Sequence, residues 1–235
     1  MQLKIFRIHK KLIEISWPQE ISDSILGEQL LVKDFLWKEY GEGIREIRMG
    51  FNTLSLKLKI EITATDCDDI LEEITQLPKS VKCHSFKTWG IPVCYDPSFG
   101  KDLEKLANLH QLSIEEVIKI HSAGSYTLHF YGFLPGFMYL AGLDSRLHTP
   151  RKDLPERLIQ TGTVAIGGKQ TGIYPMDSPG GWYAIGRSPL QFFSTNNFKE
   201  KFPSIGDKIK FQPISVEEYK NMISKPKAGI QLIKS

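Results

Sequence analysis

The first part of the chain alternates short runs of period-two hydrophobicity with two segments of helical period. Apolar residues in 3–15 predict a strand or a hairpin, which Pro18 ends. Residues 21–40 repeat apolar side chains at helical spacing, and the glycines at 41 and 43 end that helix. Residues 44–49 and 54–62 alternate apolar and polar positions, as half-buried antiparallel strands do.

A second helix is predicted from its start signal. Thr65 is the predicted cap and Asp68 the N3 residue, and the apolar stripe consists of Ile70, Leu71, Ile74 and Leu77. A strand over 81–87 is expected to follow. The order β-α-β-β-α-β predicts a ferredoxin-like domain over residues 1–87.

Residues 88–235 have a different texture, with dense glycine and proline between short β-rich runs. These runs are 127–130, 163–166, 182–185, 191–193 and 208–212. Such punctuation predicts a closed or sandwiched β structure. One helix begins at a capping box, Ser113 with Glu116, and a second is predicted over 215–223. Residues 224–235 are expected to be a basic tail or a short docking strand. The predicted fold is therefore α+β, with two domains, 1–87 and 88–235.

Composition narrows the function classes. Thirty Lys and Arg against 27 Asp and Glu give a net charge of +3, which argues against a nucleic-acid surface. No apolar run is long enough for a membrane span, and the first ten residues do not read as a signal peptide. The three cysteines, Cys67, Cys83 and Cys94, have no CxxC spacing, so we expect a reducing cytoplasm and no disulfide framework.

Histidine offers the most interesting titratable group. His121 shares the apolar face of its helix, so it is either a general acid or base, a donor to an anion, or a core histidine, and spacing favours the core. The same caution applies to His129 in a predicted strand. The histidines form no metal-binding pair, so no metal site is expected.

Three further motifs are candidates for a binding site. Residues 131–140 mix aromatics with a Pro-Gly turn, which can floor a pocket or pack as core. Arg151 can clamp a carboxylate or phosphate, although a solvated surface arginine is the more common case. Residues 170–175 and 178–182 supply amide, hydroxyl and backbone donors beside glycines, either for a small polar ligand or simply in two β-turns.

The segment GTVAIGGK at 162–169 is not a phosphate-binding P-loop. Five residues separate its first glycine from Gly-Lys where the motif has four, and Gln170 follows the lysine in place of Ser or Thr. No GxSxG elbow or Cys-His pairing indicates covalent catalysis.

Together the motifs from His121 to Leu190 resemble the PxpB family, the B subunits of 5-oxoprolinase, also called KipI or allophanate hydrolase subunit 1. The matching positions are His121, Tyr126, 132–137, 139–140, 150–151, Gly162, 164–166, 170–175, 178–182 and 185–187, with 206–207, Ile209 and Phe211 near the end. They cover about a third of the chain.

The resemblance implies a cyclophilin-like β-barrel for residues 88–235. It implies an ATP-dependent complex with the A and C subunits of 5-oxoprolinase that opens the lactam 5-oxo-L-proline to L-glutamate, with ATP as co-substrate and with little activity for this chain alone. The B and C subunits of the family are expected to activate the lactam by phosphorylation, and the A component to complete ring opening.

Such chemistry needs a carboxylate clamp, donors to developing negative charge and exclusion of water. The expected catalytic residues are His121, Arg151, Gln170 and Thr171. The expected substrate-binding residues are Phe133, Pro135, Gly136, Tyr174, Pro179, Gly180, Gly181 and Arg187.

Some positions depart from the family pattern. Gln160, Thr161, Thr163 and Met138 replace prolines and small residues that are usual there, which reshapes the pocket rim. Alternative functions are inhibition of a sensor histidine kinase, a carboxyltransferase-like role on urea or allophanate, and prolyl isomerase activity. The last is the weakest, because a fold does not confer a function.

Overall fold

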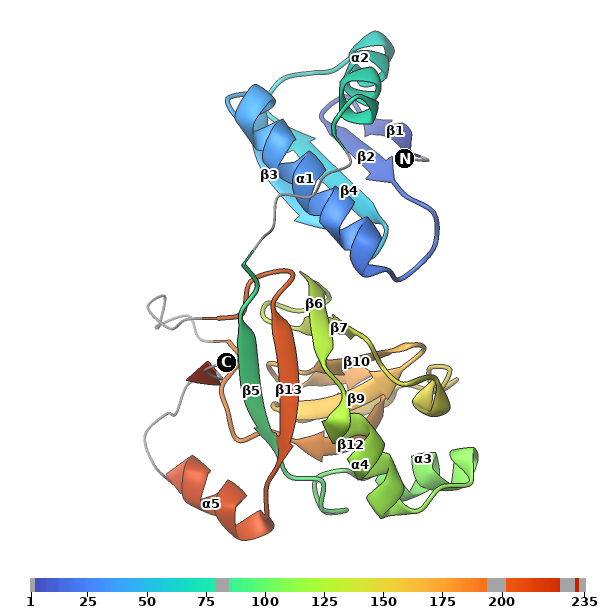
Figure 1. The fold of residues 1–235 in the computed structure, drawn as a ribbon, viewed down its shortest axis with the longest axis vertical. Coiled ribbons are helices and arrows are strands. Elements are labelled where there is room, and N and C mark those ends of the chain that lie inside the picture. The colour runs from blue at the N-terminus through green and yellow to red at the C-terminus, as the bar shows by residue number, and fades with distance from the viewer. Residues whose placement is uncertain (1–2, 79–84, 194–201, 225–230, 233–235) are drawn as a thin grey trace. The chain divides into compact units, whose positions relative to one another are not determined.

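The computed structural model describes residues 3–78, 85–193, 202–224 and 231–232. The chain divides into two compact units, Met1–Ser85 and Phe86–Ser235 (Figure 1). The sequence pattern placed the boundary after residue 87. No helix in the described ranges is long and apolar enough to cross a membrane.

The first unit is a four-stranded antiparallel sheet with two helices. Its elements are β1 (Lys4–His9), β2 (Leu12–Ser16), α1 (Asp23–Tyr40), β3 (Ile44–Met49), β4 (Thr53–Leu58) and α2 (Ala64–Thr75). The strand order is β1-β2-β4-β3, and α1 lies across one face of the sheet (Figure 1). The N-terminal segment is therefore a hairpin, one of the two predicted alternatives.

The core of the first unit follows from the alternation in its strands. Ile13 and Ile15 of β2, and Leu54 and Leu56 of β4, form one buried cluster with Leu36 of α1. The predicted cap of α2 is wrong by two residues. Thr63 accepts the backbone N–H of Asp66, and the Asp66 carboxylate accepts the N–H of Thr63, so the capping box begins earlier.

The last strand of the predicted ferredoxin-like order was expected over 81–87; residues 81–84 lie outside the described part of the chain, and residues 85–87 are not in a strand. In the described residues the edge position beside β2 belongs to β1. The ferredoxin-like detail therefore stays a prediction.

The second unit is built on an eight-stranded sheet that nearly closes into a barrel. Its strands are β5 (Thr88–Val93), β6 (Tyr126–Tyr131), β7 (Met138–Ala141), β9 (Thr163–Gly167), β10 (Gln170–Ile173), β12 (Tyr183–Arg187), β13 (Lys208–Pro213) and β14 (Gln231–Leu232). The order is β12-β9-β10-β7-β6-β13-β5-β14. Cys94, just after β5, exchanges two backbone hydrogen bonds of 2.8 and 2.9 Å with Arg187 at the end of β12. This bridge connects strands near the two opposite ends of the strand order.

Helices and a small ribbon complete this unit. They are α3 (Leu103–His110), α4 (Ile114–Ala123), the 3₁₀ turn η1 (Ser145–Leu147), the paired strands β8 (Glu156–Ile159) and β11 (Ser178–Gly180), and α5 (Val216–Ser224). The capping box of Ser113 and Glu116 is confirmed. Helix α3 was not predicted, and residues 191–193 are not a strand. Gln231–Leu232 pairs with β5, so part of the predicted tail forms a short strand, one of the two predicted alternatives. Residues 225–230 and 233–235 of that tail lie outside the described residues.

Two apolar clusters lie on opposite sides of the barrel wall. Val164 and Ile166 of β9 belong to the main core, whereas Ala165 between them belongs to a smaller cluster with Phe137, Ile159, Tyr174 and Trp182. This alternation is the period of a strand buried on both faces. The smaller cluster forms the base of the candidate site.

Candidate functional site

An aromatic pocket of about 400 Å³ opens on the outer side of the barrel wall. Phe133 and Phe137 come from the β6–β7 connection, Tyr139 from β7, Tyr174 from the end of β10 and Trp182 from the start of β12. The lining also includes Leu134, Arg151, Pro155, Ser178, Pro179, Gly180 and Gly181. Its size is in the range of small-molecule sites.

The aromatic rings pack edge to face. Phe137 lies at the centre, with ring centroids 4.9 Å from Tyr174, 5.6 Å from Trp182 and 5.6 Å from Phe133, all close to perpendicular. Tyr139 contacts Trp182 at 5.7 Å with an interplanar angle of 79°. Edge-to-face contacts of this kind hold the rings in fixed orientations, so the walls of the pocket are preformed.

Glycine makes room for these rings. A Cβ at Gly167 would lie 2.5 Å from the Trp182 ring, and one at Gly172 would lie 2.9 Å from the same ring and 2.8 Å from the Met138 carbonyl oxygen. A Cβ at Gly180 would overlap the Tyr174 hydroxyl. The glycine-rich motifs of the sequence therefore place Trp182 and Tyr174 against the sheet.

Arg151 supplies the positive charge of the pocket. Its guanidinium carbon lies 5.7 Å from the centroid of the Trp182 ring, which is a cation–π distance. Among the described residues no carboxylate forms an ion pair with Arg151, and the side chain is exposed. A planar guanidinium in this state can accept a carboxylate through two parallel hydrogen bonds.

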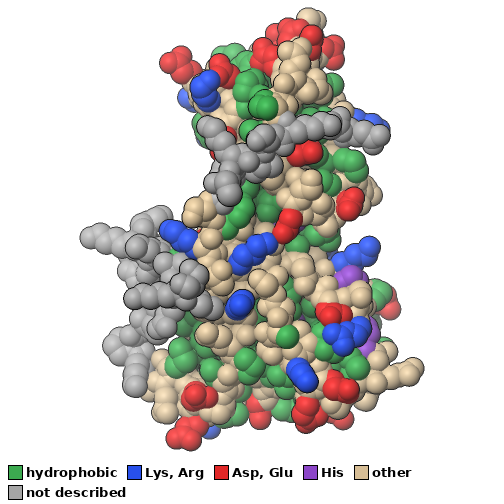
Figure 2. Space-filling view, in the orientation of Figure 1, with side chains coloured by type: hydrophobic (Ala, Val, Ile, Leu, Met, Phe, Trp, Pro, Cys, Tyr) green, Lys and Arg blue, Asp and Glu red, His purple; other side chains and the backbone are tan. Residues whose placement is uncertain are grey.

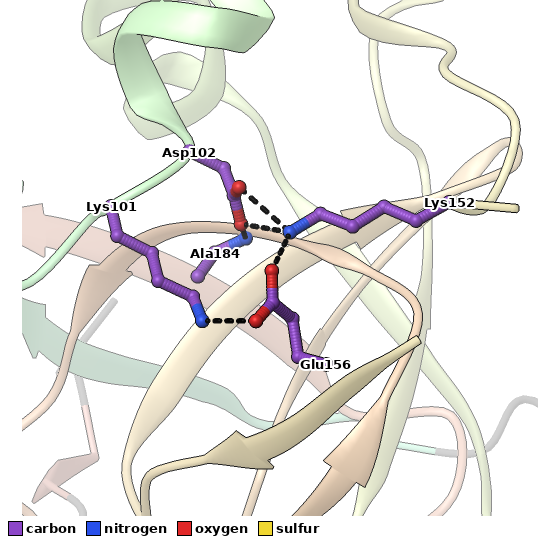
Figure 3. Close-up of polar contacts among 5 residues, drawn as sticks. All are labelled: Lys101, Asp102, Lys152, Glu156 and Ala184. Carbon is purple, nitrogen blue, oxygen red and sulfur yellow. Dashed lines mark hydrogen bonds and ion pairs between the residues drawn. The ribbon is translucent and has the colours of Figure 1, made fainter. Parts of the chain in front are cut away.

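A buried ion pair fixes the backbone beside Arg151 (Figure 3). The Lys152 ammonium lies 2.7 Å from both carboxylate oxygens of Asp102 and 3.0 Å from Glu156, which also pairs with Lys101. Asp102 accepts the backbone N–H of Ala184 at 2.8 Å as well. Burial disfavours the charged ammonium, but the hydrogen bonds to the two carboxylates outweigh it and raise the pKa of Lys152.

The backbone of Lys152 is tied to the glycine turn. Its N–H donates to the Gly181 carbonyl at 2.7 Å. Lys152 therefore points inward to Asp102, while its neighbour Arg151 faces the pocket. Lys152 and Asp102 act as positioning residues for Arg151 and the 179–181 turn.

Burial keeps the pocket tyrosines protonated. It raises the pKa of Tyr174 to about 12, with the neighbouring Tyr139 adding to the shift and Arg151 opposing it. Burial also raises the pKa of Tyr139, again against the charge of Arg151. At neutral pH both phenols are neutral O–H groups.

Two buried polar groups on this side of the sheet have no partner among the described residues. They are Ser178 Oγ, on a pocket-lining residue that is 8% exposed, and Gln170 Nε2, on a residue that is 7% exposed and does not line the pocket. Thr171 faces the main core, so strand alternation turns Gln170 to the side of Gly172 and Trp182. Unpaired buried groups of this kind are costly in a folded protein and mark places where a ligand completes the hydrogen bonding.

His121 and Thr171 lie in the barrel core and do not line this pocket. His121 is fully buried, its ring stacks on Phe211 at 4.7 Å, and its Nδ1 and Nε2 lie 2.8 Å from Tyr95 Oη and 3.0 Å from Thr171 Oγ1. The Thr171 hydroxyl donates to the Ala165 carbonyl at 3.0 Å, so it accepts from His121 Nε2–H, and Nδ1 accepts from Tyr95.

This network defines a neutral core histidine. Burial lowers its pKa to about 3. The geometry supports the core interpretation that its spacing favoured, and it gives no support to the catalytic roles predicted for His121 and Thr171.

The remaining predicted site residues hold loops. Arg187 donates to the Thr161 carbonyl at 2.9 Å and to Gln160 Oε1 at 2.6 Å, and it does not line the pocket. Gly136 has a φ of +86° and its backbone approaches Phe192, so it shapes the β6–β7 turn. Pro135 is exposed in that turn.

The pocket joins Arg151, Phe133, Tyr174, Pro179, Gly180 and Gly181 of the predicted set. As wall residues, Phe137, Tyr139 and Trp182 were missed, although all three stand in the motifs that were singled out. For Phe137 and Tyr139 the available signal was their alternation with Met138 and Leu140. Among the described residues no group of three metal-binding side chains occurs, and Cys67 and Cys94 are buried thiols. Cys83 lies outside the described ranges.

The segment that resembles a P-loop is a hairpin. Residues 163–167 form β9, and Gly168 and Lys169 turn into β10. The rejection of a Walker loop is confirmed, because the lysine is exposed on a turn between two strands and does not open a helix.

These features define a two-unit α+β protein whose barrel-like sheet carries an aromatic small-molecule pocket with one arginine. A family model described as "Carboxyltransferase domain, subdomain C and D" matches residues 3–203. The chain belongs to this family, on the branch that contains the B subunits of 5-oxoprolinase.

Curated relatives are 5-oxoprolinase B subunits. The one from Bacillus subtilis (strain 168) is 46% identical over 151 residues, which are 64% of this chain and 62% of the relative. The protein of the same name from Haemophilus influenzae is 37% identical over 172 residues, 72% of this chain and 79% of the relative. The match thus spans less than two thirds of the Bacillus protein.

Solved structures show the same architecture. Conserved uncharacterized protein PH0987 from Pyrococcus horikoshii is 35% identical, with a TM-score of 0.55 over 92% of this chain and 100% of that one. The urea amidolyase of K. lactis matches 99% of this chain with a TM-score of 0.80, over 16% of its own length. At 15% identity this last likeness concerns the fold alone.

Proposed function

We propose that this chain is the B subunit of an ATP-dependent 5-oxoprolinase complex, which cleaves 5-oxo-L-proline to L-glutamate together with the A and C subunits. The names of its relatives support the assignment. The observation that carries it is the placement of an unpaired arginine, Arg151, over the Trp182 face of an aromatic pocket.

A small cyclic amide with a carboxylate suits this pocket. Its flat ring matches the faces of Tyr139 and Trp182, and its carboxylate matches the Arg151 guanidinium. Ser178 Oγ, which lines the pocket and has no partner among the described residues, can supply a hydrogen bond to its polar atoms. Preformed walls orient such a ligand and keep part of it from water.

Lactam opening needs chemical activation because an amide is a poor electrophile. Transfer of the γ-phosphoryl group of ATP to the amide oxygen would give an imidate phosphate. Water then attacks that carbon, the ring C–N bond breaks, and phosphate leaves, so that ADP, phosphate and L-glutamate are formed.

The described pocket does not fit ATP itself. Arg151 is its one lining cation among the described residues, and no phosphate-binding loop borders it. We therefore place the nucleotide outside the pocket of this chain, in the assembled complex, and assign this chain the role of holding the lactam.

The same proposal covers the finer description of the protein. We take the first unit as a ferredoxin-like variant in which β1 fills the edge place of the fourth strand, and the second as a cyclophilin-like barrel. We propose a cytoplasmic location.

Reconstitution tests the function. The purified chain, combined with its candidate A and C subunits, is expected to form L-glutamate from 5-oxo-L-proline only when ATP is present. Arg151→Ala is expected to lower kcat/KM by about 100-fold, as loss of a desolvated bidentate carboxylate contact of about 3 kcal/mol does. Arg151→Lys keeps the positive charge but not the planar guanidinium that makes two parallel hydrogen bonds, so it should restore only part of the lost kcat/KM.

Arg157→Ala is the matched control, since Arg157 is exposed on β8 and does not line the pocket. Equal activity of Arg151→Ala and the unmodified complex would reject the pocket as the lactam site. Assembly without ATP-dependent glutamate would reject the substrate, and absence of assembly would favour the kinase-inhibitor alternative, which kinase autophosphorylation then tests.

A further inference from the structure

The first unit carries a groove of about 910 Å³ that the lactam chemistry does not use. We call it the acidic groove; it lies between the C-terminal end of α1, the strands β3 and β4, and α2. Its floor consists of buried apolar side chains such as Leu36, Leu56 and Ile70.

Two large apolar side chains remain exposed at its edge. Trp37 is 43% exposed and Ile60 is 66% exposed. Exposed apolar surface that borders a groove is typical of binding surfaces, and a tryptophan is the side chain most often found to dominate an interface.

The rim is strongly negative. Among the described residues, six carboxylates line the groove against one ammonium, that of Lys38; they are Glu39, Glu42, Glu61, Asp66, Asp69 and Glu73. Acidic side chains gather at the end of this unit that carries α2 (Figures 1 and 2).

Three of these carboxylates have no counter-ion in the part of the chain that the structure describes. Glu61 pairs with Lys10 at 3.3 Å, Glu39 with Lys38, and Asp66 serves the helix cap. Glu42, Asp69 and Glu73 form no ion pair with any described cation.

The pKa of Tyr40 reflects the negative charge in the groove. The Tyr40 hydroxyl donates to Glu73, and its pKa is raised to about 12 by burial, by that hydrogen bond, and by the charges of Glu73, Asp69 and Glu39. An apolar floor under a rim that is only partly neutralised is complementary to a chain segment with apolar anchors and lysines or arginines.

We propose that the acidic groove docks a cationic, amphipathic segment of another protein of the same complex. This inference rests on the proposed function for the identity of the partner, and on the charge and apolar surface of the groove for the chemistry of the segment. Trp37 is the apolar anchor of the interface, and Asp69 and Glu73 attract the cationic side chains.

The test compares neighbouring carboxylates on one helix. Asp69→Lys reverses a charge that lines the groove, and Asp68→Lys reverses an adjacent exposed charge that does not. Both changes place a lysine in the first turns of α2, so their effects on the helix are alike.

Affinity for the purified A and C subunits is measured separately by interferometry at low and high salt. Asp69→Lys is expected to weaken binding to one of them about tenfold at low salt and less at high salt, while Asp68→Lys changes it less than about twofold. Trp37→Ala is expected to weaken it about 30-fold, mainly through a faster dissociation rate.

The outcomes separate this inference from the proposed function. If the complex assembles and forms glutamate but neither Asp69→Lys nor Trp37→Ala changes either affinity more than Asp68→Lys does, the docking surface is rejected and the function stands. If the unmodified chain binds neither of the two proteins, both the inference and the function are rejected. Equal weakening by Asp68→Lys and Asp69→Lys also rejects the groove, because the effect is then one of overall charge.

Discussion

Asp102→Ala is expected to lower the free energy of unfolding of the second unit by about 3–5 kcal/mol. The Lys152 side chain is 8% exposed and its ammonium lies 2.7 Å from both oxygens of Asp102. The substitution therefore leaves a buried charge whose one remaining carboxylate partner among the described residues is Glu156, besides the face of the Tyr183 ring. It also removes the acceptor of the Ala184 N–H. Urea denaturation measures the loss of unfolding free energy, and hydrogen exchange of the β12 amides shows that the loss belongs to this unit.

Two further variants separate the buried pair from the surface pair. Glu156→Gln removes a carboxylate that is 38% exposed and is expected to cost less than about 1 kcal/mol. Asp102→Asn combined with Lys152→Met removes both charges and should be more stable than Asp102→Ala, because no unpaired ion stays buried. A loss below about 1 kcal/mol for Asp102→Ala would show that Lys152 finds water or another partner.

Asp102→Ala is also expected to affect the pocket, because Lys152 is held next to Arg151 and the glycine turn. The Lys152 N–H holds the Gly181 carbonyl, and Arg151 precedes Lys152 in the chain. Movement of this backbone displaces the guanidinium from the Trp182 ring, and displacements of about 1 Å are enough to weaken oriented binding strongly.

The strands and helices that were predicted correctly are those whose own residues carry an alternation or a capping signal. The alternation of Leu54, Leu56 and Leu58 indicated β4, and the capping box at Ser113 indicated α4. Helix α3 has only eight residues, and the carboxylate of Asp102 at its start accepts from Lys152 and Ala184 and does not cap it. It therefore shows little of the usual start signal.

Long-range pairing explains what sequence patterns missed in the site. The partner of Asp102 lies 50 residues away at Lys152, and no spacing rule connects them. The run from Phe137 to Leu140 alternates, but the side that faces the core is set by the strands that flank β7, and those became known only with the sheet order. Arg151 and the glycine turn were found because their chemistry is visible in the residues themselves.

His121 shows both what local spacing predicts and what only long-range contacts decide. Its helical spacing placed it on the buried stripe, whereas its partners Tyr95 and Thr171 stand on distant segments. The network explains why the histidine stays neutral, since Nδ1 accepts a hydrogen bond from Tyr95 and protonation would put two donors against each other.

The stability of the second unit is therefore expected to fall with acid pH through His121. Its pKa is about 3 in the folded state and about 6.5 in the unfolded chain, so between these values only the unfolded chain binds the proton. Above pH 6.5 both states are neutral and the effect vanishes. Below it, stability falls by about 1.4 kcal/mol for each pH unit until about pH 3, which amounts to about 2 kcal/mol between pH 6.5 and 5.

His121→Gln isolates this contribution, because the glutamine amide can accept from Tyr95 and donate to Thr171 without titrating. The variant is expected to be less stable than the unmodified chain at pH 7, and to lose less stability on acidification to pH 5 by about 2 kcal/mol. Denaturant unfolding at about pH 7, 6 and 5 measures the difference, with His9→Gln on the exposed β1 as the control. Parallel pH profiles for His121→Gln and the unmodified chain would show that His121 takes up its proton equally in the folded and unfolded states, which is incompatible with the Tyr95–His121–Thr171 hydrogen bonds.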